Sequence, residues 1–109
     1  MEQIYIDLRK ENLVDTAEDF SRKWCRRSRS WYAVQKNSGS DFSVQAAIAC
    51  LQHTQIQIAL AHLRKKTLGT AVDLEIEILR NVRSSLEAYL HCEHNILSVA
   101  PANGLSPNA

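Results

Sequence analysis

Two short apolar patterns on either side of an arginine-rich break constrain the fold of this chain most strongly. Phe20 and Trp24 are four residues apart and Trp31 and Val34 are three apart, so each pair lies on one face of a short helix. The intervening break at residues 25–28 leaves room only for a tight turn. Because two helices joined by so short a turn must cross at a steep angle, the sequence predicts a helix-turn-helix.

A basic patch coincides with this turn and the second short helix. Between Ser21 and Lys36 six residues are basic and none is acidic, although the whole chain carries a formal net charge of only +1. The basic residues are Arg22, Lys23, Arg26, Arg27, Arg29 and Lys36. A local patch of this kind is typical of a DNA-binding surface. A solvated helix face, and binding of RNA or another acidic partner, are the alternatives.

Composition favours a small all-helical protein. Both prolines, Pro101 and Pro107, lie near the C-terminus of the 109-residue chain, so no proline interrupts a helix before them. Three cysteines without a CxxC pair argue against a disulfide framework and for a reducing compartment. The N-terminus lacks the pattern of a signal peptide, and no apolar stretch approaches the ~20 residues that cross a bilayer. We therefore expect a soluble, cytoplasmic protein with no membrane partner.

Capping residues indicate where the first helices begin and end. Residues 1–14 suit a short amphipathic helix, with a stub of strand as the weaker alternative. Thr16 with Asp19 approximates a capping box that opens the next helix, which carries Phe20 and Trp24. Ser28 is expected to cap the second short helix, from Arg29 to about Lys36.

A long helix is expected after the loop at residues 37–41. Asp41 or Ser43 would cap it, and the basic residues 64–66 suit its C-terminus through the helix dipole. Its apolar stripe is predicted to comprise Val44, Ala47, Ile48, Leu51, Ile58 and Leu63, widened by Ile56, Ala59 and Leu60.

Gly69 is expected to end this helix. A last helix is predicted over residues 71–97, and Thr70 and Asp73 would form a capping box at its start. The short connection predicts an antiparallel hairpin. At 1.5 Å per residue each helix would be ~35–40 Å long, more than a small helix-turn-helix domain needs. The surplus length suggests a homodimer formed through the C-terminal helices.

The first half of the chain resembles the phage-repressor-like (Xre-type) helix-turn-helix proteins. Phe20 and Trp24 fill the apolar slots of that motif's first helix, Ser21 takes its small-residue slot, and Trp31 and Val34 fill the apolar slots of its second helix. More narrowly, the run FSRKWCRRSRSWYAV looks like a small uncharacterised bacterial family with an FSRxW…RSxSWY-type signature. The resemblance covers about half of the chain and leaves out the hairpin.

Two residues of the turn depart from the repressor-like motif. Cys25 stands where glycine is usual, and Arg26 stands at the buried apolar position that follows. An arginine is not buried there without a partner. A turn that is one residue longer, or differently shaped, is therefore an open alternative.

The resemblance implies sequence-specific binding of double-stranded DNA by a dimeric transcriptional regulator. In the geometry of that family, the base-reading residues on the groove-facing side of the second helix would be Arg27, Ser28, Arg29, Tyr32, Ala33 and Lys36. The residues left to hold phosphates would be Arg22, Lys23 and Arg26. Arginine reads guanine through two hydrogen bonds, whereas phosphate contacts add salt-dependent affinity without sequence information.

The expected fold class is all-α: a repressor-like helix-turn-helix N-terminal half followed by a long antiparallel helical hairpin. Residues 1–97 would form a single helical domain, with a helix-turn-helix-like half at 1–52 and the hairpin at 43–97. Residues 98–109 would form a flexible tail.

No metal, cofactor or catalytic residue is predicted. Cys50 and His53 share a helix face, but in an antiparallel hairpin one full turn separates them from the second set at residues 91–94, whereas zinc needs four ligands at ~2.0–2.3 Å. No glycine-rich phosphate loop, nucleophile elbow or HExxH motif is present. We do not expect an enzyme.

A second hypothesis is a protein-protein interaction module that binds its partner through the hairpin. Arg27, Arg29 and Lys36 distinguish the two hypotheses. If these side chains project together into solvent, DNA binding is favoured. If carboxylates hold them, or the hairpin covers them, the interaction module is favoured.

Overall fold

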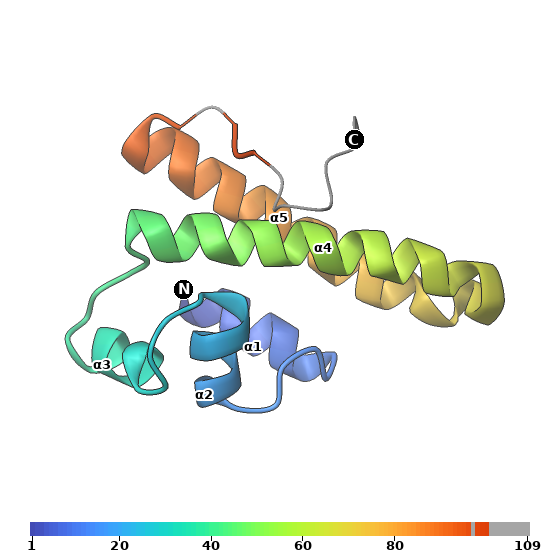
Figure 1. Ribbon diagram of the computed structural model, residues 1–109, viewed down its shortest axis with the longest axis horizontal. Coiled ribbons are helices and arrows are strands. Elements are labelled where there is room, and N and C mark those ends of the chain that lie inside the picture. The colour runs from blue at the N-terminus through green and yellow to red at the C-terminus, as the bar shows by residue number, and fades with distance from the viewer. Residues whose placement is uncertain (97, 101–109) are drawn as a thin grey trace.

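The computed structural model describes residues 1–96 and 98–100, and this part of the chain is helical and contains no β-strand (Figure 1). The all-α fold class is therefore confirmed. The elements in chain order are α1 (Glu2–Lys10), α2 (Ala17–Asp19), the π-helical segment η1 (Phe20–Trp24), α3 (Trp31–Asn37), α4 (Val44–Leu68), the 3₁₀ turn η2 (Gly69–Val72) and α5 (Asp73–His94).

The helices form two layers. Helices α4 and α5 run antiparallel and make the long hairpin, as predicted. Residues 1–43, called the N-terminal unit below, pack beneath the half of the hairpin in which α4 begins (Figure 1). The opposite half extends beyond them. Residues 59–78 of that half are called the projecting end.

Side-chain caps and a glycine set the bounds of the helices where the sequence predicted them. The Thr16 hydroxyl accepts a hydrogen bond from the Asp19 amide (3.1 Å) at the start of α2. Ser43 caps α4 in the same way, whereas the other candidate, Asp41, accepts from the next amide instead. Gly69 ends α4 with a φ of 61°, which glycine adopts without strain.

Four predicted boundaries are wrong. Helix α3 begins at Trp31 rather than Arg29, so Ser28 does not cap it. The predicted capping box between Thr70 and Asp73 does not form, because the chain turns through η2 and α5 starts only at Asp73. At the other end α5 stops at His94, before a left-handed Asn95, and α1 stops at Lys10. Of the predicted tail, residues 101–109 lie outside the described residues.

The turn between η1 and α3 covers residues 25–30 and is longer than the predicted turn at residues 25–28. Cys25 is buried, and the positive φ (52°) belongs to Arg26, whose side chain is exposed. Cys25 thus lacks the positive φ expected at the motif's glycine position, and Arg26 does not occupy the motif's buried apolar position. A left-handed arginine costs about 1–2 kcal/mol, which is less than the cost of burying its charge.

The buried hydroxyl of Ser21 joins the two short helices. Its Oγ donates to the Ala17 carbonyl (3.0 Å) and accepts from the Tyr32 amide (2.9 Å) at the start of α3. The Ser21 carbonyl also accepts from the Arg27 amide (2.8 Å) in the turn. A residue without a hydroxyl would leave the buried Tyr32 amide without this acceptor, so the small-residue slot is also a hydrogen-bonding position.

An aromatic cluster fills the N-terminal unit and corrects the predicted faces of α3. Tyr32 is only 3% exposed and packs between Phe20 (5.5 Å between ring centroids) and Tyr5 (4.7 Å). Val34, predicted to be buried, is 57% exposed, while Trp31 is half-buried and stacks on Phe42. The core of the unit thus takes Tyr32 in place of Val34.

Replacing Ser21 with alanine is expected to destabilise the protein by about 1–3 kcal/mol, because a buried amide loses its acceptor. Urea unfolding followed by circular dichroism measures this change. The matched control is Ser84→Ala, an exposed position on α5, for which the change should stay within about 0.5 kcal/mol. Equal effects at both positions would show that the Ser21 hydroxyl does not hold the turn.

Candidate functional site

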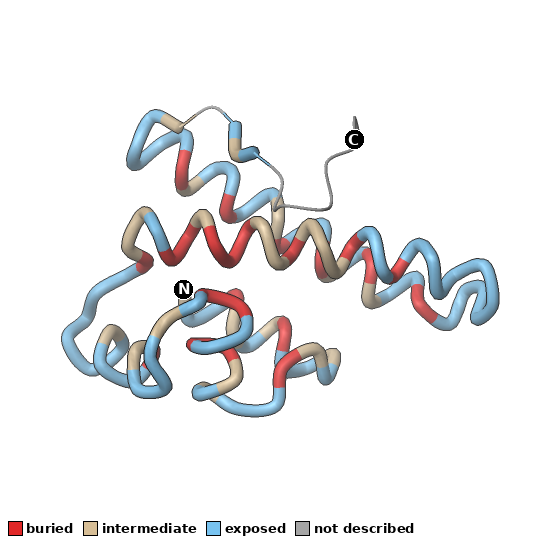
Figure 2. The backbone as a smooth tube through the Cα atoms, viewed as in Figure 1, coloured by how far each residue is buried: buried red, intermediate tan, exposed pale blue. Residues whose placement is uncertain are grey.

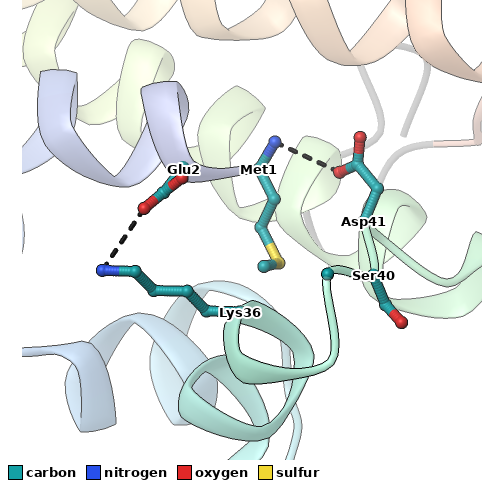
Figure 3. Close-up of a pocket in the computed structure, with 6 residues that line it drawn as sticks. Met1, Glu2, Lys36, Ser40 and Asp41 are labelled. Atoms are coloured by element: carbon teal, nitrogen blue, oxygen red, sulfur yellow. Dashed lines mark ion pairs between the residues drawn. The ribbon is translucent and has the colours of Figure 1, made fainter.

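Half of the predicted basic patch is paired with carboxylates of the same unit. The ion pairs are Lys23–Asp19 (3.8 Å), Arg29–Glu18 (3.2 Å) and Lys36–Glu2 (3.3 Å). Figure 3 shows the last of these across a small pocket between α1 and the end of α3. The positive charge that the sequence concentrates in residues 21–36 is therefore partly cancelled by acidic residues from α1 and α2.

The remaining arginines differ in how they are held. Arg26 donates a hydrogen bond to Gln52 Oε1, and the half-buried Arg27 donates one to Ser43 Oγ, both at 3.4 Å. Both side chains therefore contact α4 or its N-cap residue. Arg22 is exposed on η1. Of the six basic residues of the patch, Arg26 and Arg27 thus contact α4, and Arg22 is exposed.

The predicted base-reading residues do not all share one exposed surface. Ser28, Arg29, Ala33 and Lys36 are exposed, but the buried Tyr32 cannot reach a base edge, so its predicted role is wrong. The residues from Arg27 to Arg29 lie in the turn before α3, because the helix starts only at Trp31. A groove-reading helix therefore presents fewer side chains than predicted.

Arg29 and Lys36, two of the three residues that distinguish the hypotheses, are held by carboxylates, and Arg27 is half-buried against α4. Exposed ion pairs of this kind contribute only about 0–1 kcal/mol, so phosphates could displace them. Their carboxylates would nevertheless face the phosphates and repel them. The three side chains therefore do not form the unpaired, solvent-facing surface that the DNA hypothesis expects.

The pocket in Figure 3 is polar and has a volume of about 250 Å³. Besides the Lys36–Glu2 pair, its lining holds the Met1 amino group 3.1 Å from Asp41 Oδ1. Each charged group that lines the pocket is already paired with another group of the lining. The pocket therefore offers little unbalanced charge to hold a ligand.

The buried titratable groups behave as core residues. Burial, together with a hydrogen bond to Cys50, raises the pKa of the Cys25 thiol, which stays protonated and unreactive. Burial and the nearby Arg26 charge lower the pKa of His53, whose ring packs edge-on against Trp24 (4.5 Å). Within the described residues no group of three or more His, Cys, Asp and Glu side chains could hold a metal ion.

A different surface stands out at the projecting end of the hairpin. Of the six large hydrophobic side chains recorded as exposed, four are leucines of this segment, which is a concentration rather than a scatter. They are Leu60 (44% exposed), Leu63 (59%), Leu68 (53%) and Leu74 (54%). In Figure 2 most of this tip of the hairpin has the pale blue colour of exposed residues.

The prediction that Leu60 and Leu63 belong to the buried stripe is therefore wrong. Residues three or four apart along α4 form a row on one face of the helix, and the course of this row explains why Leu60 is exposed. Cys50 and His53 in this row meet Cys25 and Trp24 of the N-terminal unit. Two further steps along α4 lead to Leu60, which belongs to the projecting end. Figure 1 shows that this end of the hairpin extends beyond the N-terminal unit. The apolar pattern of α4 therefore extends beyond the part of the helix that the N-terminal unit covers.

Charges on the projecting end cancel locally. Arg64 Nη2 lies 2.6 Å from Glu75 Oε1, and Lys65 Nζ lies 2.7 Å from Asp73 Oδ1, so both pairs link α4 to α5. Residues 59–78 contain three basic and three acidic side chains, and their formal charges sum to zero. The exposed leucines thus sit in a surface with no dominant charge.

The fold and these surfaces define an all-α protein in which a small helical unit supports one half of a long hairpin. The chain belongs to a family of unknown function, DUF6626, whose family model matches residues 1–100. No curated protein and no solved structure matches the chain. No helix in the described part is both long enough and apolar enough to cross a membrane.

Proposed function

We propose that this protein is an interaction module that binds a partner protein through the projecting end of its hairpin. The observation that carries the proposal is the group of exposed leucines at residues 60, 63, 68 and 74, beyond the N-terminal unit. Single exposed leucines are ordinary on protein surfaces, but a group of them at one end of two packed helices is typical of a docking surface.

The energetics support docking at this surface. Complete burial of a leucine side chain is worth about 1.5–3 kcal/mol. Leu60 and Leu63, three residues apart, share a face of α4 and are each about half exposed, so roughly 1 kcal/mol per side chain, or about 2 kcal/mol for this pair, remains to be gained. A partner that also contributes apolar side chains would gain a comparable amount, enough to offset part of the cost of association.

The N-terminal unit acts in this proposal as a scaffold that stiffens the other half of the hairpin. Tyr89 Oη donates to the Phe42 carbonyl (2.6 Å), and Trp24 packs on His53, so the unit contacts both helices. A hairpin held at one end presents its free end in a fixed orientation, which lowers the entropy lost on docking.

DNA binding is the second candidate function, favoured by one observation. Arg22 and Arg26 are exposed beside the turn between η1 and α3, and the ion pairs recorded for the patch do not include them. They match positions that the repressor-like motif implies for phosphate contacts. This surface would supply salt-dependent affinity, whereas the loss of Tyr32 from the reading face reduces sequence specificity.

A photo-cross-linking amino acid at position 63 is expected to trap a defined protein adduct in cells that naturally make the chain. The matched control places it at position 34, where the native valine is equally exposed but lies on the N-terminal unit. Adducts identified by mass spectrometry should form at position 63 and not at position 34. Absence of adducts at position 63, or the same adducts at both positions, would contradict docking by the hairpin.

The DNA candidate predicts binding to mixed-sequence duplex DNA that weakens steeply with salt, measured by fluorescence anisotropy. An Arg22→Ala/Arg26→Ala variant should lower the slope of log K against log salt concentration by about 2, because two phosphate contacts are lost. Arg80→Ala/Arg83→Ala, on the hairpin, changes the net charge equally and should leave the slope unchanged. No binding at low salt would eliminate DNA binding as a function.

A further inference from the structure

We infer that the contact between the N-terminal unit and α4 is a pH-sensitive switch, in which protonation of His53 releases the unit from the helix. The inference goes beyond the proposed function, since it concerns the supported half of the hairpin and not the projecting end. Three observations carry it: the place of His53 in the contact, the charge beside its ring, and the hydrogen bond that the ring makes.

His53 lies where the two layers of the molecule meet. It is half-buried on α4, and its ring centroid is 4.5 Å from that of Trp24, which is buried on η1. One turn earlier on α4, the buried Cys50 forms a hydrogen bond with Cys25, at the end of η1. A change that pushes His53 and Trp24 apart therefore also separates the N-terminal unit from α4.

A positive charge already stands beside the ring of His53. Arg26, in the turn after η1, donates a hydrogen bond (3.4 Å) to Gln52, the residue that precedes His53 on α4. Among the described residues, the one charge recorded to act on His53 is that of Arg26, and no carboxylate of the N-terminal unit or of α5 acts on it. Burial and the Arg26 charge together lower the pKa of His53 below its ordinary value of 6.5. A charged His53 would thus repel Arg26 inside a half-buried contact.

The hydrogen bond of the ring also fits the neutral form of His53. Gln57 Nε2, one turn further along α4, lies 3.3 Å from His53 Nε2. Because an amide nitrogen only donates, this contact assigns the acceptor role to His53 Nε2 and the ring proton to Nδ1. Protonation at Nε2 removes the acceptor, so the Gln57 amide must turn over to keep a partner. The closed contact therefore accommodates the neutral ring better than the charged one.

The sign of the pH dependence follows from the lowered pKa of His53. In the released state the ring is in water and takes up a proton near pH 6.5, whereas in the closed contact it takes one up only at a lower pH. Between these two values the released state binds more protons, so its population rises as the pH falls through about 6.5. Below the pKa of the closed contact the population stops rising.

Thiol labelling of the full chain tests the switch, because the protein carries its own reporters. Cys25 and Cys50 are buried on the two sides of the contact, and Cys92 is exposed on α5. Pulses of N-ethylmaleimide at about pH 7.5 and about pH 5.5, read by mass spectrometry of the peptides, give the labelling of each buried cysteine relative to Cys92. This ratio removes the ordinary effect of pH on thiol reactivity. For both buried cysteines it should rise several-fold at the lower pH.

Substitutions separate His53 from other causes of a pH effect. His53→Gln should abolish the rise in labelling, and Arg26→Gln should reduce it, because the charge beside the ring is lost. His62→Gln is the matched control, since it removes an exposed histidine from the projecting end of the same helix, and it should keep the full rise. Circular dichroism at both pH values should show that the helices stay formed.

A labelling ratio that does not change with pH in the native chain would overturn the inference, as would an equal rise in the His53→Gln variant. Loss of helix at the lower pH would also overturn it, because labelling would then report unfolding of the whole chain and not release of the N-terminal unit. These outcomes leave the proposed docking surface untouched, since none of the reporters lies on the projecting end.

Discussion

Two-sided burial of the first half of α4 holds this molecule together. Small residues make it possible, since Ala46, Ala47, Ala49 and Cys50 let neighbouring backbones approach one helix from two directions. One side meets α5 and the other meets the N-terminal unit, through contacts such as Trp24 on His53. In the second half of α4 only the side facing α5 stays covered. The exposure of Leu60 and Leu63 results from this loss of cover, because the apolar pattern of α4 extends beyond the part of the helix that the N-terminal unit contacts.

Capping chemistry is local, and the sequence predicts three of its positions correctly but not the caps at Ser28 and Thr70. Thr16, Ser43 and Gly69 act as expected because each depends on a few neighbouring residues. The buried face of a helix is harder to predict where it depends on contacts with residues distant in the sequence. Tyr32 is buried because Tyr5 and Phe20 meet across the unit, which spacing within α3 does not reveal. Leu63 fits the buried stripe by periodicity, and only the extent of the N-terminal unit shows that it is exposed.

The candidate sites show the same limit. Sequence located the basic patch, but the carboxylates of Glu2 and Glu18 that neutralise part of it come from other helices. The proposed docking surface was missed as a set of residues, because Leu60 and Leu63 were assigned to the buried stripe of α4. One signal did point to it, namely a hairpin longer than a small helix-turn-helix domain needs. Length and periodicity together therefore predicted an extra interface, without locating it.

The central claim is that the projecting end of the hairpin is the surface that binds. Hydrogen–deuterium exchange of the pure protein, compared with its complex with the partner that cross-links at position 63, tests this most directly. Slower exchange in the complex is expected in amides of residues 59–78, with no change in the N-terminal unit. Protection confined to the N-terminal unit, or spread evenly over the chain, would contradict it.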